Sequence, residues 1–183
     1  MIRCSWAKGE LEIDYHDHQW CVENHDDHYL YEMLVLEGMQ AGLSWTLILK
    51  RREGMRRAFD GFDYRVIATY DDAKIAALML NPDVIRNRLK LKSLVSNAQA
   101  FLRVQEEYGS FDQYIWSFTN RQRIIHAVHG PEDVPTRNAL SDQISKDLKK
   151  RGFKFVGSVI VYSYLQAIGV IDDHMEQCFC KQS

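Results

Sequence analysis

Metal-binding residue types stand near both ends of this 183-residue chain. Cys4 and His16 lie at the start, and His174 and Cys178 lie near the end, with three residues between them. If residues 172–178 are helical, this spacing places His174 and Cys178 one turn apart on the same face. Two cysteines and two histidines fill the four tetrahedral positions of zinc and leave none for water. The pattern therefore predicts a structural zinc ion that ties the two chain ends together.

A simpler interpretation is that the four cysteines are ordinary reduced residues and that His174 lies on the surface. They are too few and too unevenly placed for a disulfide framework, and no secretion signal precedes them. Cys180 could also take the place of Cys178 as a ligand. In either case we expect a soluble, cytoplasmic protein.

The composition is that of one globular domain spanning residues 1–183, with 46% hydrophobic and 11% aromatic residues. The most apolar stretch, Val156 to Ile171, is interrupted by glycine, serine and glutamine, so it suits a buried helix and not a membrane span. The net charge of −2 hides a segregation of sign. Acidic residues crowd the first 37 positions, and basic residues gather around positions 50, 88 and 150. Each basic group alone suits a solvated helix face, but on one surface they would form a phosphate-binding patch.

The hydrophobic pattern is helical almost throughout, and strand signals are scarce. Asp26 or Asp27, Ser44, and Asp71 or Asp72 can cap helices, and Pro82 can open one. We therefore expect an all-α, single-domain helical bundle with no obligate protein partner. Its predicted helices span about 28–40, 45–59, 73–80, 82–107, 111–118, 139–150, 158–168 and 172–178.

Glu37 is out of place on the first strong helix, because its position falls on the apolar face formed by Leu30, Met33 and Leu34. A buried carboxylate needs a satisfying group, which could be an arginine, a loop amide or a ligand. Trp45 follows a turn at Gly42 and could line a pocket with Glu37. Aromatic faces and one carboxylate suit a flat, cationic ring.

The segment 149–157 joins a basic helix to an apolar one through Gly152 and Gly157. Two glycines permit a tight turn, and the amides before the second helix can point at an anion. This is the geometry of a helix-hairpin-helix phosphate clamp, although glycine-bounded turns between helices are common.

Longer motifs carry a resemblance that covers nearly the whole chain. They are Arg3-Cys4 with Trp6, Tyr15-His16-Asp17 with Trp20, Leu36-Glu37-Gly38, Gln40-Ala41-Gly42-Leu43-Ser44-Trp45, Ile85-Arg86-Asn87-Arg88, Trp116-Ser117-Phe118, Lys150 to Gly157, and Asp173-His174 with Cys178. In this order they resemble bacterial 3-methyladenine DNA glycosylase I. The resemblance implies the helix-hairpin-helix DNA glycosylase fold, a structural zinc site, and excision of N3-methyladenine from alkylated double-stranded DNA, with free 3-methyladenine as product.

The resemblance also implies roles for individual residues. Cys4, His16, His174 and Cys178 match the zinc ligands. Glu37 matches the carboxylate that contacts the methylated base, and Tyr15 and Trp45 match the aromatic residues that enclose it, with Trp6 and Ser163 as further pocket candidates. The expected DNA contacts are Gly42, Leu43, Gly152, Lys154 and Gly157. Cys21 and Leu89 stand where family members usually or sometimes have glycine, which affects the loops.

A cationic methylated base leaves readily once it is extruded, and Glu37 is the preferred carboxylate to assist attack of water on the sugar. Asp172 is a second candidate. Related helix-hairpin-helix glycosylases place a catalytic aspartate shortly after the hairpin helix, and Asp172 falls near that position. No lysine stands out as a nucleophile, so we expect no strand cleavage. Two alternatives use the same residues: a non-catalytic reader of alkylated DNA would release no base, and a zinc hydrolase would need an open coordination position.

Overall fold

The computed structural model describes residues 1–181, and the chain is mostly helical in this range. Its elements follow in the order α1 (Glu10–His18), α2 (Asp27–Gln40), α3 (Trp45–Ala58), the 3₁₀ turn η1 (Asp60–Phe62), α4 (Tyr64–Ile67), α5 (Asp72–Leu80), α6 (Arg88–Tyr108), α7 (Phe111–Ser117), β1 (Ile124–Ile125), the 3₁₀ turn η2 (Pro131–Asp133), α8 (Ala139–Lys150), α9 (Ser158–Ala167) and β2 (Ile171–Asp172). Within this range no helix is long and apolar enough to cross a membrane.

The helix starts follow the capping residues that the sequence indicates. The side chains of Asp26, Ser44 and Asp71 each accept a hydrogen bond from an amide in the first turn of α2, α3 and α5. Asp27 has a different role, because its carboxylate accepts the amides of Phe111 and Asp112 at the start of α7. The predicted helices at these positions are confirmed.

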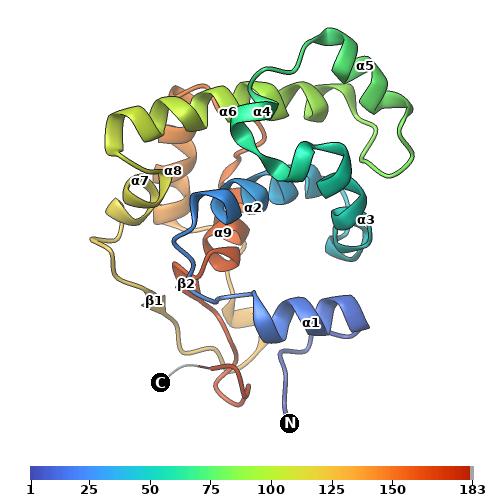
Figure 1. Ribbon diagram of the computed structural model, residues 1–183. Helices are drawn as coiled ribbons and strands as arrows, with labels where there is room; N and C mark the ends of the chain where they lie inside the picture. Colours follow the sequence, from blue (N-terminus) through green and yellow to red (C-terminus); the bar gives the residue numbers. More distant parts are fainter. Residues whose placement is uncertain (182–183) are drawn as a thin grey trace.

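Helix α2 lies at the centre of the molecule, with α3, α6, α7 and α9 packed around it (Figure 1). All of its residues from Leu30 to Met39 are buried. Tyr31 donates a hydrogen bond to the carbonyl of Leu94 on α6, and Tyr164 on α9 donates to the carbonyl of Leu30. Because this part of α2 is enclosed on all sides, a polar side chain between residues 30 and 39 must face either a protein partner or a cavity.

One predicted helix is wrong at its start, and another is wrong over its whole length. The helix expected from Pro82 begins at Arg88, because Asn87 has extended backbone angles and its side chain caps the amides of Leu89 and Lys90. Residues 172–178 form no helix; they continue from β2 into turns. Strand β2 pairs in parallel with β1, which gives its backbone groups partners that a helix would otherwise supply.

Helix α1 and the strand pair were not expected from the sequence. The α1 sequence is mostly polar and has no clear apolar face, and each strand has only two residues. These elements bring the chain ends together on the side of the molecule away from α5 (Figure 1). There the amide of Phe179 donates to the carbonyl of Ile2 at 3.0 Å.

Candidate functional site

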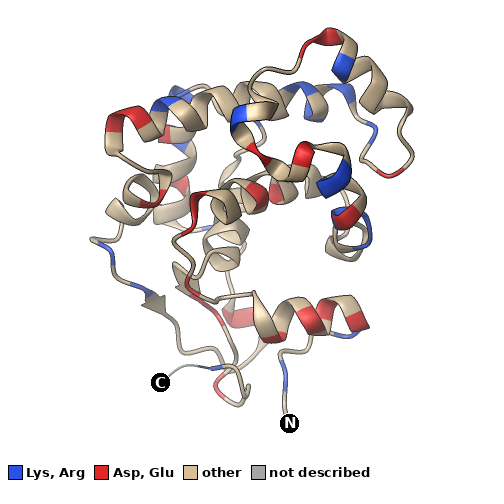
Figure 2. Cartoon of the chain, viewed as in Figure 1, with Lys and Arg blue, Asp and Glu red and all other residues tan. Residues whose placement is uncertain are grey.

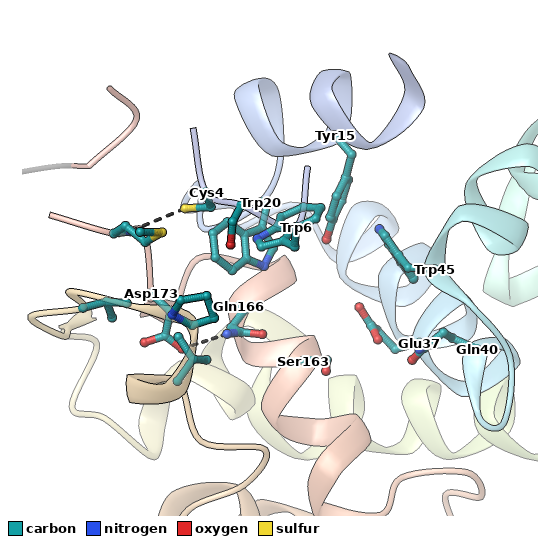
Figure 3. A pocket seen from close by; sticks show the side chains of 15 residues that line it. Cys4, Trp6, Tyr15, Trp20, Glu37, Gln40, Trp45, Ser163, Gln166 and Asp173 are labelled. Atoms are coloured by element: carbon teal, nitrogen blue, oxygen red, sulfur yellow. Dashed lines mark hydrogen bonds between the residues drawn. The ribbon is translucent and has the colours of Figure 1, made fainter. Parts of the chain in front are cut away.

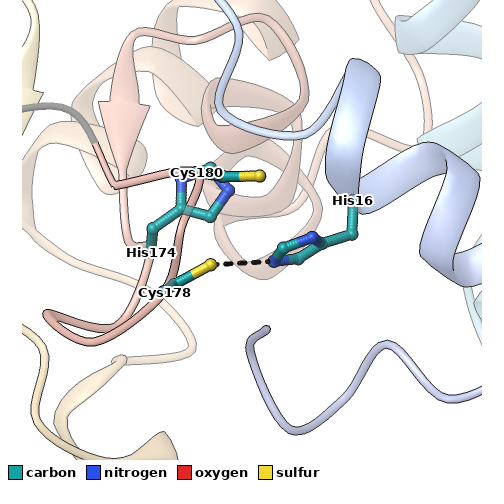
Figure 4. A group of neighbouring side chains, drawn as sticks. All are labelled: His16, His174, Cys178 and Cys180. Carbon is teal, nitrogen blue, oxygen red and sulfur yellow. Dashed lines mark hydrogen bonds between the residues drawn. The ribbon is translucent and has the colours of Figure 1, made fainter. Parts of the chain in front are cut away.

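Metal-binding side chains meet where α1 lies against the C-terminal segment (Figure 4). The ligand atoms of His16, His174, Cys178 and Cys180 all lie within 4.8 Å of one another. The first three of these residues are buried, and the Cys178 Sγ lies 3.5 Å from the His16 Nε2. The two ends of the chain therefore form a group that could hold a metal ion.

Carboxylates orient both histidines of this group. Asp17 accepts a hydrogen bond from the His16 Nδ1 at 2.8 Å, and Asp172 accepts one from the His174 Nδ1 at 2.9 Å. Hydrogen bonding from Arg3 lowers the pKa of Asp17 to about 2, so Asp17 is ionised and the ring Nδ1 carries the proton. This arrangement leaves each Nε2 with its lone pair, as a metal ligand requires. Burial also lowers the pKa of His16, which favours its neutral form.

The His174 Nε2 is buried, and among residues 1–181 no group is hydrogen bonded to it. An unpaired buried nitrogen is costly in a folded protein unless a ligand satisfies it. Imidazole nitrogens and cysteine sulfurs are the donors that zinc prefers in tetrahedral sites. The residues present therefore fit such an ion.

Cys4 lies at the edge of this cluster and is not one of the four residues. Its Sγ accepts a hydrogen bond from the Met175 amide at 3.4 Å. Burial raises the pKa of the Cys4 thiol to about 12, and the nearby Cys178 adds to this rise. Cys180 enters the group because the segment after β2 turns back on itself. The helical spacing argument for His174 and Cys178 is thus wrong, although the two side chains do meet.

A cavity of about 300 Å³ opens beside this cluster, between α1, α2 and α9 (Figure 3). Its walls are mostly apolar and aromatic. The lining residues are Cys4, Ser5, Trp6, Tyr15, Trp20, Glu37, Gln40, Trp45, Val128, Pro131, Val134, Ser163, Gln166, Asp173 and Met175. The structure thus brings together all the residues that the sequence placed around a base, from Tyr15 and Trp45 to Trp6 and Ser163.

Glu37 enters the cavity from the buried face of α2, and its carboxylate points toward Tyr15 and Trp45 (Figure 3). The residue is 4% exposed, and no hydrogen bond or ion pair reaches its carboxylate from anywhere in residues 1–181. Burial raises its pKa to about 8. Two nearby arginines, Arg52 and Arg56, pair with Glu32 instead, at 2.7 and 2.6 Å. An arginine partner for Glu37, one of the expected alternatives, is therefore wrong.

Aromatic rings form the wall opposite Glu37. Tyr15 and Trp45 have ring centroids 5.1 Å apart, and Trp6 lies 6.4 Å from Tyr15 and 5.0 Å from Trp20. The indole nitrogens of Trp6 and Trp45 are buried and have no acceptor in the described part of the chain. The cavity therefore combines flat apolar surfaces with unpaired donors and one unpaired carboxylate. Such a lining suits a planar polar ring.

Asp172 is fully buried and does not line the cavity. Its carboxylate accepts hydrogen bonds from His174 and lies 3.4 Å from Arg123. The neighbouring Asp173 lines the cavity, although Tyr162, Gln166 and His126 all hydrogen bond to it. Asp173 and Gln166 were not predicted to line a cavity, because Asp173 stood out only as part of the motif around His174 and Gln166 only as a polar residue in an apolar helix. Of the two adjacent aspartates, Asp172 thus contacts the candidate metal-binding cluster and Asp173 lines the cavity.

The turn between α8 and α9 has the tight backbone that its glycines suggest. Gly152 and Phe155 have positive φ angles of 95° and 54°. The Lys154 backbone is held by Asn97, while the Lys154 side chain is exposed. Gly42, with φ of 76°, makes a second tight turn before Leu43. Both turns present backbone and side chains that could contact a ligand outside the cavity.

Basic side chains are spread over α3, α6 and the α8–α9 region, whereas α1 is acidic (Figure 2). Part of the basic charge is used internally, because Arg52 and Arg56 pair with Glu32, and Arg151 pairs with both Glu107 and Asp147. Exposed basic residues without an ion pair to any residue of the described range include Arg86, Arg88, Lys149, Lys150 and Lys154.

Comparison with known proteins identifies close relatives. The family model for methyladenine glycosylase matches residues 6–181. DNA-3-methyladenine glycosylase from Haemophilus influenzae is 43% identical over 182 residues, which are 99% of this chain and 98% of that protein. DNA-3-methyladenine glycosylase 1 from Escherichia coli is 41% identical over 181 residues, with 98% and 97% of the two chains covered.

A solved structure shows the same fold. It is the crystal structure of a tyrosine-to-phenylalanine variant of 3-methyladenine DNA glycosylase I in complex with 3-methyladenine. The TM-score is 0.97 at 36% sequence identity, and the alignment covers 100% of this chain and 99% of that chain. The likeness therefore extends over the whole described fold.

Proposed function

Since the chain belongs to the methyladenine glycosylase family, we propose that it excises 3-methyladenine from alkylated DNA by hydrolysing the bond between the base and the sugar. The curated relatives are DNA-3-methyladenine glycosylases, and a structural relative binds 3-methyladenine. The single observation on this chain that carries the proposal is the unpaired Glu37 carboxylate in an aromatic cavity.

The cavity chemistry suits a base methylated at N3. Such a base is cationic while it is attached to the sugar, so it gains from aromatic faces and from a carboxylate. Tyr15 and Trp45, with Trp6 beside them, would enclose the ring, and Glu37 would accept hydrogen bonds from its donors. Ser163 would complete the wall on the α9 side. Unmethylated adenine is neutral and would gain less from the same site.

Hydrolysis needs little more than extrusion of the base and a placed water. The cationic base departs as a neutral leaving group, and water then attacks C1′ of the sugar. Glu37 is the cavity carboxylate whose oxygens have no partner in the described range, so it can stabilise the developing positive charge or orient the water. Asp172 is engaged by His174 and Arg123, and we assign it to supporting the metal cluster. No lysine occurs among the described lining residues, in keeping with a monofunctional enzyme that leaves the strand intact.

We propose that the α8–turn–α9 unit is a helix-hairpin-helix clamp within a single domain covering residues 1–183. The Gly152 and Gly157 backbone and the exposed Lys154 ammonium would hold phosphates of double-stranded DNA. Gly42 and Leu43 would contact the duplex from the other side of the cavity, where the base must leave the stack. The positive φ at Gly42 and Gly152 supports a close approach of backbone to DNA at both turns.

We further propose that the cluster at the chain ends holds one structural zinc ion. His16, His174 and Cys178 would be ligands, and the fourth would be Cys4, as the family resemblance implies, with Cys180 as its competitor. The unpaired Nε2 of His174 supports a ligand at this place. The bound ion would supply no catalysis; it would hold the N-terminal segment that carries Trp6 against the C-terminal segment.

The test of the proposed function is release of free base. Duplex DNA treated with a methylating agent would be incubated with the protein, and the released bases would be separated by chromatography. We expect 3-methyladenine as product, with unbroken strands and no base released from untreated DNA. Tight binding of methylated DNA with no release of any base would instead identify a non-catalytic reader.

A further inference from the structure

Lys90 is a buried lysine on the inner face of α6. It is 5% exposed, and its Nζ donates hydrogen bonds to the carbonyls of Met39 and Ala41 at 2.8 and 2.6 Å. These carbonyls lie at the C-terminal end of α2, where the last carbonyl groups have no partner within the helix. A cation is favoured at this end of a helix. Lys90 therefore fixes the point at which the chain leaves α2 and enters the turn at 41–44.

Asn97 holds the hairpin from the same helix, about two turns further on. Its Oδ1 accepts the Lys154 amide at 2.8 Å, and its Nδ2 donates to the Lys154 carbonyl at 3.0 Å. Asn97 is also buried, at 5% exposure. The backbone of the hairpin is thus tied to α6 at the residue whose side chain is exposed to solvent.

The hairpin contacts the last turns of α2, just before the turn at 41–44. A Cβ placed on Gly38, the neighbour of Glu37, would lie 3.4 Å from the Phe155 Cβ. The Lys90 ammonium also lies 6.0 Å from the centre of the Phe155 ring. The turn at 41–44, the hairpin and the end of α2 that carries Glu37 therefore meet at one junction, which α6 holds from behind.

We propose that Lys90 is a positioning residue that fixes the turn at 41–44 relative to the hairpin, so that DNA held at both places delivers its extruded base to Glu37. This inference rests on the proposed function. Lys90 does not line the cavity, and it acts through the backbone of the turn. A buried ammonium costs desolvation energy that an apolar side chain avoids, so its two directed hydrogen bonds indicate a geometric role. Loss of the Lys90 side chain should therefore lower the affinity for duplex DNA more than the affinity for free 3-methyladenine.

The test compares Lys90→Met with the parent in three measurements. They are binding of free 3-methyladenine, binding of a duplex with a stable abasic-site analogue, and steady-state excision from methylated duplex. Methionine keeps the length of the side chain and removes both hydrogen bonds. We expect duplex affinity and kcat/KM to fall about tenfold, since charged hydrogen bonds are worth on the order of that factor. Affinity for free 3-methyladenine should stay within about twofold of the parent, because Glu37 and the aromatic wall are held by their own packing.

Matched variants distinguish a positioning role of Lys90 from a general effect of losing a positive charge and from a loss of folding. Lys92→Met removes an exposed lysine of the same helix, whose ammonium lies 3.7 Å from Asp72, and should behave like the parent. Lys90→Arg keeps donors and charge and should recover part of the duplex affinity. If Lys90→Met does not fold, Lys90→Gln carries the same test, because glutamine is one bond shorter and has no positive charge.

Two outcomes would overturn the role of Lys90. Parent-like duplex binding and excision in a folded Lys90→Met protein would show that the contact is dispensable. An equal loss of free-base and duplex affinity would show that Lys90 supports the cavity and not the turn. If the parent itself released no base from methylated DNA, the proposed function would fail, while the two binding measurements would still decide the role of Lys90.

Discussion

Glu32 and Glu37 lie on the same helix, and both are buried, but their surroundings differ. Glu32 is 5% exposed and is paired with Arg52 and Arg56, whereas Glu37 is 4% exposed and has no partner within residues 1–181. A protein that needed only to satisfy a buried carboxylate would place a cation or amide beside it, as it does for Glu32. The unpaired state of Glu37 therefore supports the proposal that its partner is a ligand.

The first prediction concerns the charge of Glu37. Glu37→Gln keeps the size of the side chain and removes its ability to become an anion. Each charge-assisted hydrogen bond is worth roughly 1.5–3 kcal/mol, so kcat/KM for excision should fall about 10- to 100-fold. Single-turnover excision from methylated duplex is the measurement, with far-ultraviolet circular dichroism as the control for folding. Parent-like excision by the folded variant would show that Glu37 is only a buried core residue.

The second prediction follows from the pKa of Glu37, which burial raises to about 8. Only the ionised carboxylate attracts a cationic base, so kcat/KM should rise as the pH increases toward 8, and Glu37→Gln should lack this rise. The measurement is kcat/KM from pH 6 to 9 for both proteins. Identical profiles for the two proteins would remove Glu37 as the source of the pH dependence.

Stability should change in the opposite direction over the same range. The folded protein binds a proton at Glu37 that the unfolded chain releases near pH 4.5, the ordinary pKa of glutamate. The contribution of Glu37 to the free energy of unfolding is therefore fully present below about pH 4.5 and is lost as the pH rises through about 8. Urea unfolding of the parent and of Glu37→Gln should diverge across this window, with the parent losing stability relative to the variant.

At the scale of elements, the long helices were predictable because local signals define them. The caps at Asp26, Ser44 and Asp71 and the apolar runs behind them set the starts of α2, α3 and α5. Helix α1 was not predictable in this way, because its nine residues are mostly polar and it is held in place by contacts from distant parts of the chain. One example is the hydrogen bond from Thr46 on α3 to Glu12.

The C-terminal segment shows the limit of spacing arguments. His174 and Cys178 are four residues apart, in a pattern that fits a helical turn, yet the segment begins in a strand and then turns. The pairing partner, β1, lies about fifty residues earlier, so no local window contains the information. Glu37 and Trp45 were predicted as pocket residues from the helical pattern and the turn, and Ser163 from the family resemblance, whereas the place of Asp173 and Gln166 in the cavity required the tertiary structure.

The third prediction concerns the hairpin. The Lys154 side chain is exposed and has no partner in the described range, while Asn97 holds its backbone. Lys154→Ala should therefore leave the turn intact and remove one phosphate contact. Affinity for methylated and unmethylated duplex should fall alike, and the slope of log K against log salt should become shallower by roughly one unit. The measurement is duplex binding by fluorescence anisotropy at several salt concentrations, and an unchanged slope with unchanged affinity would exclude Lys154 from the interface.

At the scale of the whole molecule, segments from both chain ends form the candidate metal-binding cluster and also line the cavity. Cys4 and Trp6 belong to the same short segment, and both line the cavity. Cys178 and Met175 approach this segment from the other end of the chain. A metal ion at the cluster would thus fix the wall of the base pocket as well as the ends of the fold.

The last prediction tests this closure by a metal ion. An ion bridging residues about 170 apart closes a very long loop, which chain-entropy models value at roughly 4–5 kcal/mol, or about 10–20 °C in melting temperature for a chain of this size. Cys178→Ser should therefore release zinc and lower the melting temperature by that order. Cys4→Ser should do the same, and Cys180→Ser should keep the metal, if the fourth ligand is Cys4. Elemental analysis of each purified protein, with a melting curve before and after chelation, makes the comparison. Metal loss in Cys180→Ser but not in Cys4→Ser would show that Cys180 is the fourth ligand. The absence of stoichiometric zinc from the parent purified without chelator would show that the fold contains no structural zinc ion.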